Sequence, residues 1–151
     1  MIKVLFICHG NICRSAMCEF IMKDMAARAG LADKVIIDSA ATSREEIGND
    51  MYPPARRKLQ QEGIPFAPRR ARQVTREDYE NYDLILCMEA YNLRNIKRII
   101  PEDPEGKIKL LLDYTDHPRD IADPWYTGNF DETYDDLTEG CEALLKVIAE
   151  M

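Results

Sequence analysis

Two residues near the start of the chain have the types and the spacing of a thiol-based catalyst. Cys8 and Arg14 are separated by five residues, and Gly10 lies in the stretch between them. A loop of this length can wrap a tetrahedral anion with its backbone N–H groups pointing inward, and an arginine can close the ring with two parallel hydrogen bonds. The pattern predicts a cysteine nucleophile aimed at an oxyanion, and it favours a phosphate ester.

The spacing of Cys8 and Arg14 is weak evidence by itself, but the residues around the pair strengthen the prediction of an anion site. An apolar run over residues 4–7 precedes Cys8, and helical spacing begins at residue 13. A strand that ends in a loop and feeds a helix N-terminus directs several backbone N–H groups at one anion. That position and Arg14 favour the thiolate form of Cys8, and Ser15 can donate a hydrogen bond to its sulfur. The alternative is a buried thiol at a strand end and a solvated arginine.

A thiolate that attacks a phosphate monoester also needs a proton donor for the leaving group, and the sequence offers Asp123. This residue precedes Pro124, Trp125 and Tyr126. The proline restricts the backbone at the aspartate, and the two aromatic side chains can form a wall for a flat substrate ring. The alternative is an ordinary turn aspartate followed by two aromatic residues of the core.

The elements that must position these residues alternate between strands and helices. Apolar, β-branched runs predict four strands, over residues 2–8, 34–40, 82–88 and 108–112. Helical spacing predicts helices over residues 13–30, 55–62, 89–100 and 132–150, and residues 117–126 are expected to be irregular. This alternation predicts an α/β fold, a three-layer doubly wound sandwich with a four-stranded parallel sheet in the flavodoxin-like order 2-1-3-4, flanked by helices. Ligands of such sheets bind beyond the strand C-termini, where Cys8 stands.

Length, charge and cysteine content limit the remaining possibilities. The 151 residues suit a single domain, 1–151, and the net charge of −7 argues against a nucleic acid or a membrane surface as partner. No apolar run approaches the ~20 residues of a membrane helix, and no signal peptide is recognised. The five cysteines form no metal-ligand pair and are expected to be reduced thiols. We therefore expect a cytoplasmic protein without a metal or cofactor.

Two motifs of the chain match one known family. Its C-x-G-N-x-C-R-S loop matches Cys8-His9-Gly10-Asn11-Ile12-Cys13-Arg14-Ser15, and its acid loop matches Asp123-Pro124-Trp125-Tyr126. Further matches in the family's order are Asp38-Ser39-Ala40, Ala71-Arg72-Gln73 and Ile85-Leu86-Cys87-Met88-Glu89, followed by Asn92-Leu93. Over nearly its whole length the chain resembles the low-molecular-weight protein tyrosine phosphatases.

This resemblance implies an activity and the residues that carry it. Cys8 would become a phosphocysteine, Arg14 would bind the phosphoryl oxygens, and Asp123 would protonate the leaving group and then activate water. The substrate would be a phosphotyrosine protein or a small aryl phosphate, and the product inorganic phosphate. The substrate-binding residues would be His9, Gly10, Asn11, Ile12, Cys13, Ser15, Trp125 and Tyr126. No metal is implied, because Arg14 and the backbone amides already supply positive charge.

The resemblance also implies how the loop is supported. Asn11 would hold it through hydrogen bonds to Ser15 and Ser39. A histidine is common in the family where Arg69 or Arg70 stands here, so the support of the loop from that side differs. The arginine at this place either adds positive charge to the loop or is a solvated surface residue. The basic run that contains it is expected to be ion-paired with carboxylates, and the side chain of His9 to point to solvent.

Other activities on similar scaffolds provide the alternatives. Protein-arginine phosphatases resemble this chain but have a threonine where Ile12 stands, and the apolar isoleucine favours a phenyl ring. Arsenate reductases need a relay of three cysteines, and no cysteine follows Cys87 in the next predicted helix, while Cys141 is expected in the core. Cys13 is a candidate resolving cysteine that would protect an oxidised Cys8 by forming a disulfide with it.

Overall fold

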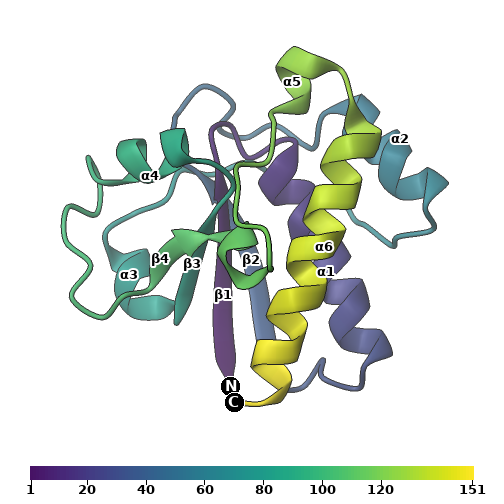
Figure 1. The fold of residues 1–151 in the computed structure, drawn as a ribbon. Helices are drawn as coiled ribbons and strands as arrows, with labels where there is room; N and C mark the ends of the chain where they lie inside the picture. Colours follow the sequence, from purple (N-terminus) through teal and green to yellow (C-terminus); the bar gives the residue numbers. More distant parts are fainter.

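The computed structural model describes residues 1–151 and places one four-stranded sheet between helices on both of its faces (Figure 1). The strands are β1 (Ile2–Cys8), β2 (Val35–Ala41), β3 (Leu84–Cys87) and β4 (Ile108–Leu110). All pair in parallel, in the order β2-β1-β3-β4. The helices are α1 (Arg14–Arg28), α2 (Pro53–Gln61), α3 (Glu77–Asn81), α4 (Ala90–Ile96), α5 (Pro124–Thr127) and α6 (Phe130–Ala149), with a 3₁₀ turn, η1 (Leu111–Tyr114). The predicted fold class and strand order are confirmed.

Strand β1 lies in the middle of the sheet and is buried on both faces. Val4 and Phe6 join the core on the side of α1 and α6, whereas Leu5 and Ile7 join the core on the side of α3 and α4. Burial of both faces explains why this strand reads as a continuous apolar run rather than an alternating one. The strand ends at Cys8, which is therefore fixed by packing from two layers.

Two segments near the C-terminal end of the sheet differ from their predicted conformation. Strand β4 ends at Leu110, because the chain turns into η1 and the carboxylate of Asp113 accepts the Leu110 N–H at 3.0 Å. The stretch expected to be irregular contains the helix α5, whose first residue is Pro124 and whose N-cap is Asp123. Both residues are typical of helix starts. The helix is only four residues long, which is too short for a helical repeat of apolar residues to be recognised in the sequence.

Helix α6 passes so close to η1 that one of its positions has no room for a side chain. A Cβ atom at Gly140 would lie 2.5 Å from Cγ of Leu111. In an exposed helix the change from glycine to alanine stabilises by about 1 kcal/mol, but here overpacking reverses the sign. We expect Gly140→Ala to lower the free energy of unfolding by about 1–3 kcal/mol, measured by urea denaturation. The exposed Glu142→Ala in the same helix is the control, and a more stable Gly140→Ala would contradict this packing.

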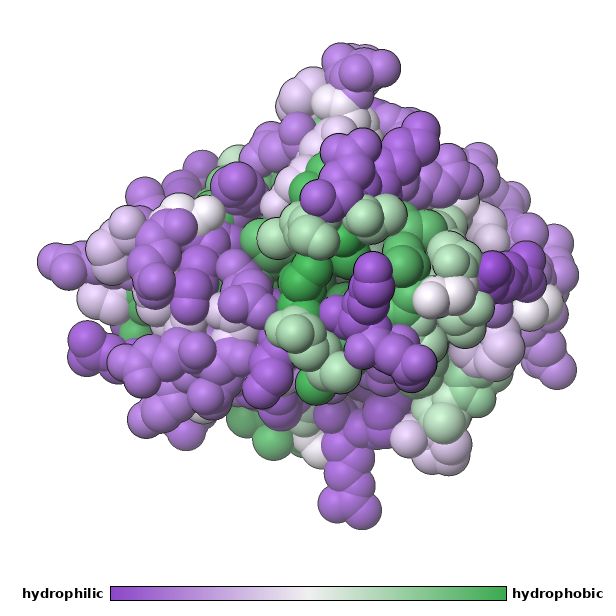
Figure 2. All heavy atoms as spheres, turned by 90° about the horizontal axis from the view of Figure 1, so that it is seen from below, coloured by the Kyte–Doolittle hydropathy of each residue, from purple (hydrophilic) through white to green (hydrophobic).

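The two ends of the sheet present different surfaces. Both chain termini lie at the end where β1 begins, which Figure 2 shows as a hydrophobic patch bordered by hydrophilic groups (Figures 1 and 2). None of the helices combines the length and the apolarity needed to cross a membrane. The carboxyl ends of the strands lie at the opposite end, where α5 and the loop after β1 meet.

Candidate active site

A cavity of about 120 Å³ opens at the carboxyl end of β1. Its lining residues come from three separate segments and are Cys8, His9, Gly10, Ile12, Cys13, Arg14, Glu45, Glu46, Asp123, Trp125 and Tyr126. The fold thus brings Asp123 to the same cavity as Cys8 and Arg14, which precede it by more than 100 positions. Of the residues that the sequence assigns to substrate binding, only Asn11 and Ser15 are absent from the lining. Both are fully buried behind it.

The sulfur of Cys8 lies among hydrogen-bond donors. The backbone N–H of Asn11 donates to Cys8 Sγ at 3.2 Å, and Ser15 Oγ lies 2.9 Å from the same sulfur. A hydroxyl at this distance can donate to a thiolate, as the sequence predicts. Helix α1 begins at Arg14, so its N-terminus also faces the loop. Each of these contacts favours the charged form of the thiol.

Asn11 holds the shape of the loop from within. It is the one residue other than glycine with a positive φ, at 60°, a conformation that asparagine tolerates better than most residues. Its Nδ2 donates to Ser15 Oγ at 2.8 Å and to Ser39 Oγ at 2.9 Å. Ser39, on β2, donates in turn to Glu19 of α1 at 2.6 Å. The two serine bonds are those that the family resemblance implied.

Arg14 is the largest fully buried polar side chain, with 1% of its surface exposed. Its Nη1 donates to Glu89 Oε2 at 2.6 Å and to the carbonyl oxygen of Ile121 at 2.8 Å, and its Nη2 donates to Asp123 Oδ2 at 3.3 Å. Burial opposes the charge, but the neighbouring Cys8, Asp123 and Glu89 raise the pKa of Arg14 above its ordinary value. The guanidinium is therefore a fixed cation in a defined orientation at the cavity wall.

Glu89 belongs to a stretch of the sequence that matches the family, but no role was predicted for it. It is the N-cap of α4, two residues beyond the end of β3, and its own N–H donates to Asn92 Oδ1 at 3.1 Å. This capping fixes the carboxylate that holds Arg14. A carboxylate at a strand's carboxyl end, next to a predicted anion site, was the signal that could have identified it.

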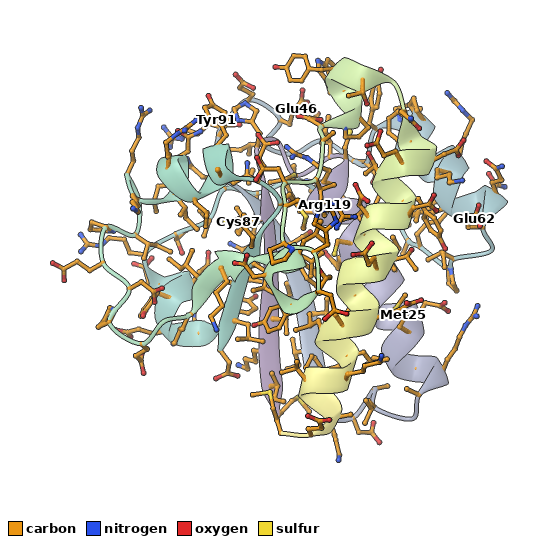
Figure 3. All side chains as sticks on the ribbon, viewed as in Figure 1. Met25, Glu46, Glu62, Cys87, Tyr91 and Arg119 are labelled. Carbon is orange, nitrogen blue, oxygen red and sulfur yellow. The ribbon has the colours of Figure 1, made fainter.

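Asp123 occupies a rigid position at the cavity mouth. Its Oδ1 accepts the N–H of Trp125 at 3.0 Å, which is the N-cap bond of α5, and its Oδ2 faces Arg14. The segment before it is tied down at two places. Arg119 pairs with Asp136 of α6 at 2.8 Å, beside the helix in Figure 3, and the N–H of Ile121 donates to Met88.

The two aromatic residues after Asp123 are exposed and do not belong to the core. Trp125 is 52% exposed and Tyr126 is 82% exposed, yet both line the cavity. The ring of Trp125 packs against Tyr52, with 4.8 Å between the ring centroids. The alternative that these are core aromatics is therefore excluded, and their position fits the predicted wall for a substrate ring.

The opposite rim of the cavity is acidic. Glu45 accepts a bond from Nε2 of His9 at 2.7 Å, and Glu46 accepts one from Asn49 at 2.6 Å. Figure 3 shows Glu46 and Tyr91 at this end of the molecule. The imidazole of His9 is 30% exposed, and its Nε2 is bound to the exposed Glu45, so it lies at the cavity rim and is only partly open to solvent.

The basic run after residue 68 is only partly ion-paired. Arg72 donates to both carboxylate oxygens of Asp78, at 2.9 and 3.1 Å, which confirms the expected pairing for this residue. Arg69 instead donates to Oδ1 of Asn11 at 2.5 Å, and Arg70 is exposed. The choice that the sequence left open is resolved in favour of Arg69, which supports the loop. No group of three or more His, Cys, Asp or Glu side chains is arranged to hold a metal ion.

Comparison with known proteins agrees with this geometry. The family model described as low molecular weight phosphotyrosine protein phosphatase matches residues 3–151. The low molecular weight protein-tyrosine-phosphatase YfkJ of Bacillus subtilis is 42% identical over 150 residues, which are 98% of this chain and 96% of the relative. The crystal structure of YfkJ has a TM-score of 0.95 at 41% identity and covers 99% of this chain and 96% of its own.

A second solved structure bears on the substrate. It is described as an arginine phosphatase of Drosophila and is 27% identical, with a TM-score of 0.86 and coverage of 96% of this chain and 96% of its own. The fold is thus shared with a protein named for a different phosphorylated residue. The family match nevertheless spans nearly the whole chain, and the chain belongs to the low molecular weight phosphotyrosine protein phosphatase family of hydrolases.

Proposed function

We propose that residues 1–151 form one phosphatase domain that hydrolyses phosphotyrosine and other aryl phosphate monoesters, with Cys8 as nucleophile. The observation that carries this proposal is the convergence at one cavity of a thiol surrounded by donors, a buried guanidinium and a carboxyl. Asp123 lies 3.3 Å from Arg14, and both line the cavity with Cys8 at its floor. This set supplies a nucleophile, a cation for the phosphoryl oxygens and a proton donor.

In the first step the Cys8 thiolate attacks phosphorus, and the bond between phosphorus and the phenolic oxygen breaks. Arg14 and the backbone N–H groups of the loop stabilise the charge on the phosphoryl oxygens. Asp123, protonated at this stage, transfers its proton to the leaving phenolic oxygen. The products of this step are a free phenol and a phosphocysteine, and Asp123 remains as a carboxylate.

In the second step Asp123 acts in the reverse direction. Its carboxylate removes a proton from a water molecule, whose oxygen attacks phosphorus. The bond between sulfur and phosphorus breaks, the thiolate of Cys8 is regenerated, and inorganic phosphate leaves. The bond from Ser15 to Cys8 Sγ supports this step, because a hydrogen-bonded thiolate is a better leaving group.

The direct test is hydrolysis of para-nitrophenyl phosphate in the presence of a chelator of divalent metals. We expect steady turnover, inhibited competitively by inorganic phosphate, because phosphate is the product and fits the same loop. Absence of turnover in a folded sample, or turnover that requires an added metal, would contradict the proposal.

Phosphoarginine is the second candidate substrate. Glu45 and Glu46 on the cavity rim would attract the guanidinium of such a substrate, which favours this candidate. Ile12, 8% exposed, instead offers an apolar contact beside Trp125 and Tyr126, which favours a phenyl ring. Cys87, by contrast, lies in the core outside the cavity, and burial raises the pKa of its thiol, so it does not support a redox relay.

Residue 12 should therefore change the substrate preference. We expect Ile12→Thr to lower kcat/KM for a phosphotyrosine peptide and to raise it for the matched phosphoarginine peptide, since a hydroxyl replaces an apolar wall. We expect the ratio of the two kcat/KM values to change by about 10-fold, which is the usual effect of one apolar contact in a substrate pocket. Rates on the two peptides measure it, with Ile12→Val as the conservative control. An unchanged ratio would show that this side chain does not select the substrate.

Cys13 is proposed as a resolving thiol. Peroxide would convert the Cys8 thiolate to a sulfenic acid, and attack by the Cys13 sulfur would release water and form a disulfide. Burial raises the pKa of Cys13 well above its usual value, so the disulfide is expected to form slowly. Mass spectrometry after mild peroxide tests this. Over-oxidised Cys8 without a Cys8–Cys13 linkage would contradict it.

The cysteines and the net charge of the chain support a cellular compartment and a class of partner. All five cysteines are free and buried, which supports a reducing compartment such as the cytoplasm. The net charge of −7 supports a phosphoprotein or small aryl phosphate as partner and opposes nucleic acid or an anionic membrane surface.

A further inference from the structure

Arg69 reaches the back of the catalytic loop from a segment almost 60 residues away in sequence. Its Nη2 donates to Asn11 Oδ1 at 2.5 Å, and its Nη1 donates to the carbonyl oxygen of Asn49 at 3.4 Å. We propose that Arg69 is a positioning residue, whose guanidinium fixes Asn11 and places a permanent positive charge behind Cys8. This inference rests on the proposed function of Cys8 as nucleophile.

Every hydrogen-bonding group of the Asn11 side chain has a partner. An asparagine amide offers two N–H donors and two lone pairs on its oxygen. The donors go to Ser15 and Ser39, and the oxygen accepts from Arg69 and from the backbone N–H of Arg72 at 3.3 Å. Because Asn11 is fully buried, loss of the Arg69 bond would leave an acceptor partly unsatisfied where water cannot replace the donor.

The position of Asn11 matters to the sulfur directly. Its backbone N–H donates to Cys8 Sγ, and its φ of 60° is maintained only by its surroundings. If the side chain is released, the backbone can relax and this donor turns away from the thiolate. Arg69 therefore acts on Cys8 through Asn11, without touching the substrate.

The charge of Arg69 is a second contribution, because no carboxylate forms an ion pair with its guanidinium. Its side-chain bonds go to two amide oxygens, and it takes part in none of the ion pairs of the structure. Burial lowers the pKa of Arg69 below its ordinary value, while Glu19, Asp50 and Cys8 favour its charged form. Its attraction to Cys8 is mutual, so the guanidinium favours the thiolate.

The other charged groups around Arg69 are already engaged. The cavity beside it, about 280 Å³, is lined by Glu19, Asp38, Ser39, Arg69, Arg70, Arg72 and Tyr82. Glu19 accepts from Ser39 and Lys23, and Asp38 accepts from the hydroxyl of Tyr82. Burial, together with this bond, raises the pKa of Tyr82 to about 12. An arginine keeps its charge between about pH 5 and pH 8, whereas a histidine ordinarily titrates near 6.5. The support of the loop is therefore independent of pH in this range.

The two neighbouring arginines do not share this role. The guanidinium of Arg72 is bound by both oxygens of Asp78. Arg70 is exposed and forms no hydrogen bond or ion pair, although it has the same charge and is the next residue. Arg70→Gln is therefore a matched control for the loss of one positive charge in this cavity.

The test combines turnover with direct labelling of the thiol. For Arg69→Met we expect kcat/KM on para-nitrophenyl phosphate to fall about 10- to 100-fold, as for a lost charge-assisted hydrogen bond. Alkylation of Cys8 by iodoacetamide at pH 6 should slow in parallel, because only the thiolate reacts. Arg69→Lys, which keeps the charge, should restore much of both rates, and Arg70→Gln should match the wild type.

A second variant tests the permanence of the charge. Arg69→His should retain activity below the imidazole pKa of about 6.5 and lose it above, which adds a limb to the pH profile that the wild type lacks. Wild-type rates in Arg69→Met would overturn the proposal. If that variant does not fold, an Arg69→His profile identical to the wild type would do so.

The proposed function is tested separately by Cys8→Ser. Full turnover in Cys8→Ser would mean that the proposed function itself fails. If Cys8→Ser is inactive and the Arg69 variants turn over and alkylate like the wild type, only the role of Arg69 is wrong.

Discussion

Cys8→Ser is expected to reduce kcat for para-nitrophenyl phosphate by about 10⁴-fold or more, as is usual when a catalytic nucleophile is removed. A serine hydroxyl is a weak nucleophile without an adjacent general base. The groups within hydrogen-bond distance of Cys8 Sγ are the N–H of Asn11 and the hydroxyl of Ser15, and neither is a base. Arg14 stays in place in the variant, so inorganic phosphate should still bind. Initial rates and calorimetric titration with phosphate measure the two effects.

The matched control is another cysteine of the chain. Cys141 is buried in α6, outside the cavity, and its replacement by alanine should leave kcat within a few-fold of the wild type. Activity of Cys8→Ser near the wild-type value would exclude a phosphocysteine at this position. Loss of phosphate binding together with activity would instead point to a collapsed loop.

Asp123→Asn is expected to lower kcat by about 10²- to 10⁴-fold on phenyl phosphate, the usual contribution of a general acid. The amide oxygen of asparagine can still cap α5 through the N–H of Trp125, so the loop should keep its position. The loss of kcat/KM, which reports only the steps up to the phosphocysteine, should be much smaller on para-nitrophenyl phosphate, because nitrophenolate is a stable leaving group that needs less protonation.

The comparison of the two substrates tests whether Asp123 protonates the leaving group, and not only whether the residue is needed for activity. Asp116→Asn removes an exposed carboxylate of the same segment and serves as control for the change in charge. Equal losses of kcat/KM on phenyl phosphate and para-nitrophenyl phosphate would contradict proton donation to the leaving group in the first step.

The fold could be predicted from the sequence where a buried element leaves a clear pattern of apolar residues. Strand β1 has the predicted bounds, Ile2–Cys8, because both of its faces are covered and the apolar run ends where the cover ends. The same signal misplaced the end of β4. Leu111 and Leu112 are buried and apolar but belong to η1, and apolarity reports burial rather than backbone conformation.

The site residues that could be predicted from the sequence are those whose signal lies within one short segment. The spacing of Cys8 and Arg14 and the neighbours of Asp123 were sufficient to identify these three residues. The contacts of Glu89 with Arg14 and of Arg69 with Asn11 join segments 75 and 58 positions apart. No local pattern encodes such contacts, because they depend on how β3 and the segment before Ala71 pass the loop.

The measurement closest to the central claim is isolation of the covalent intermediate. Asp123→Asn lacks the base of the second step, so its phosphocysteine should accumulate after mixing with para-nitrophenyl phosphate. Acid quenching, digestion and mass spectrometry should then find one phosphoryl group on the peptide that contains Cys8, located on the sulfur. An equimolar burst of nitrophenol with the phosphoryl group on another residue, or with none on the protein, would contradict the account.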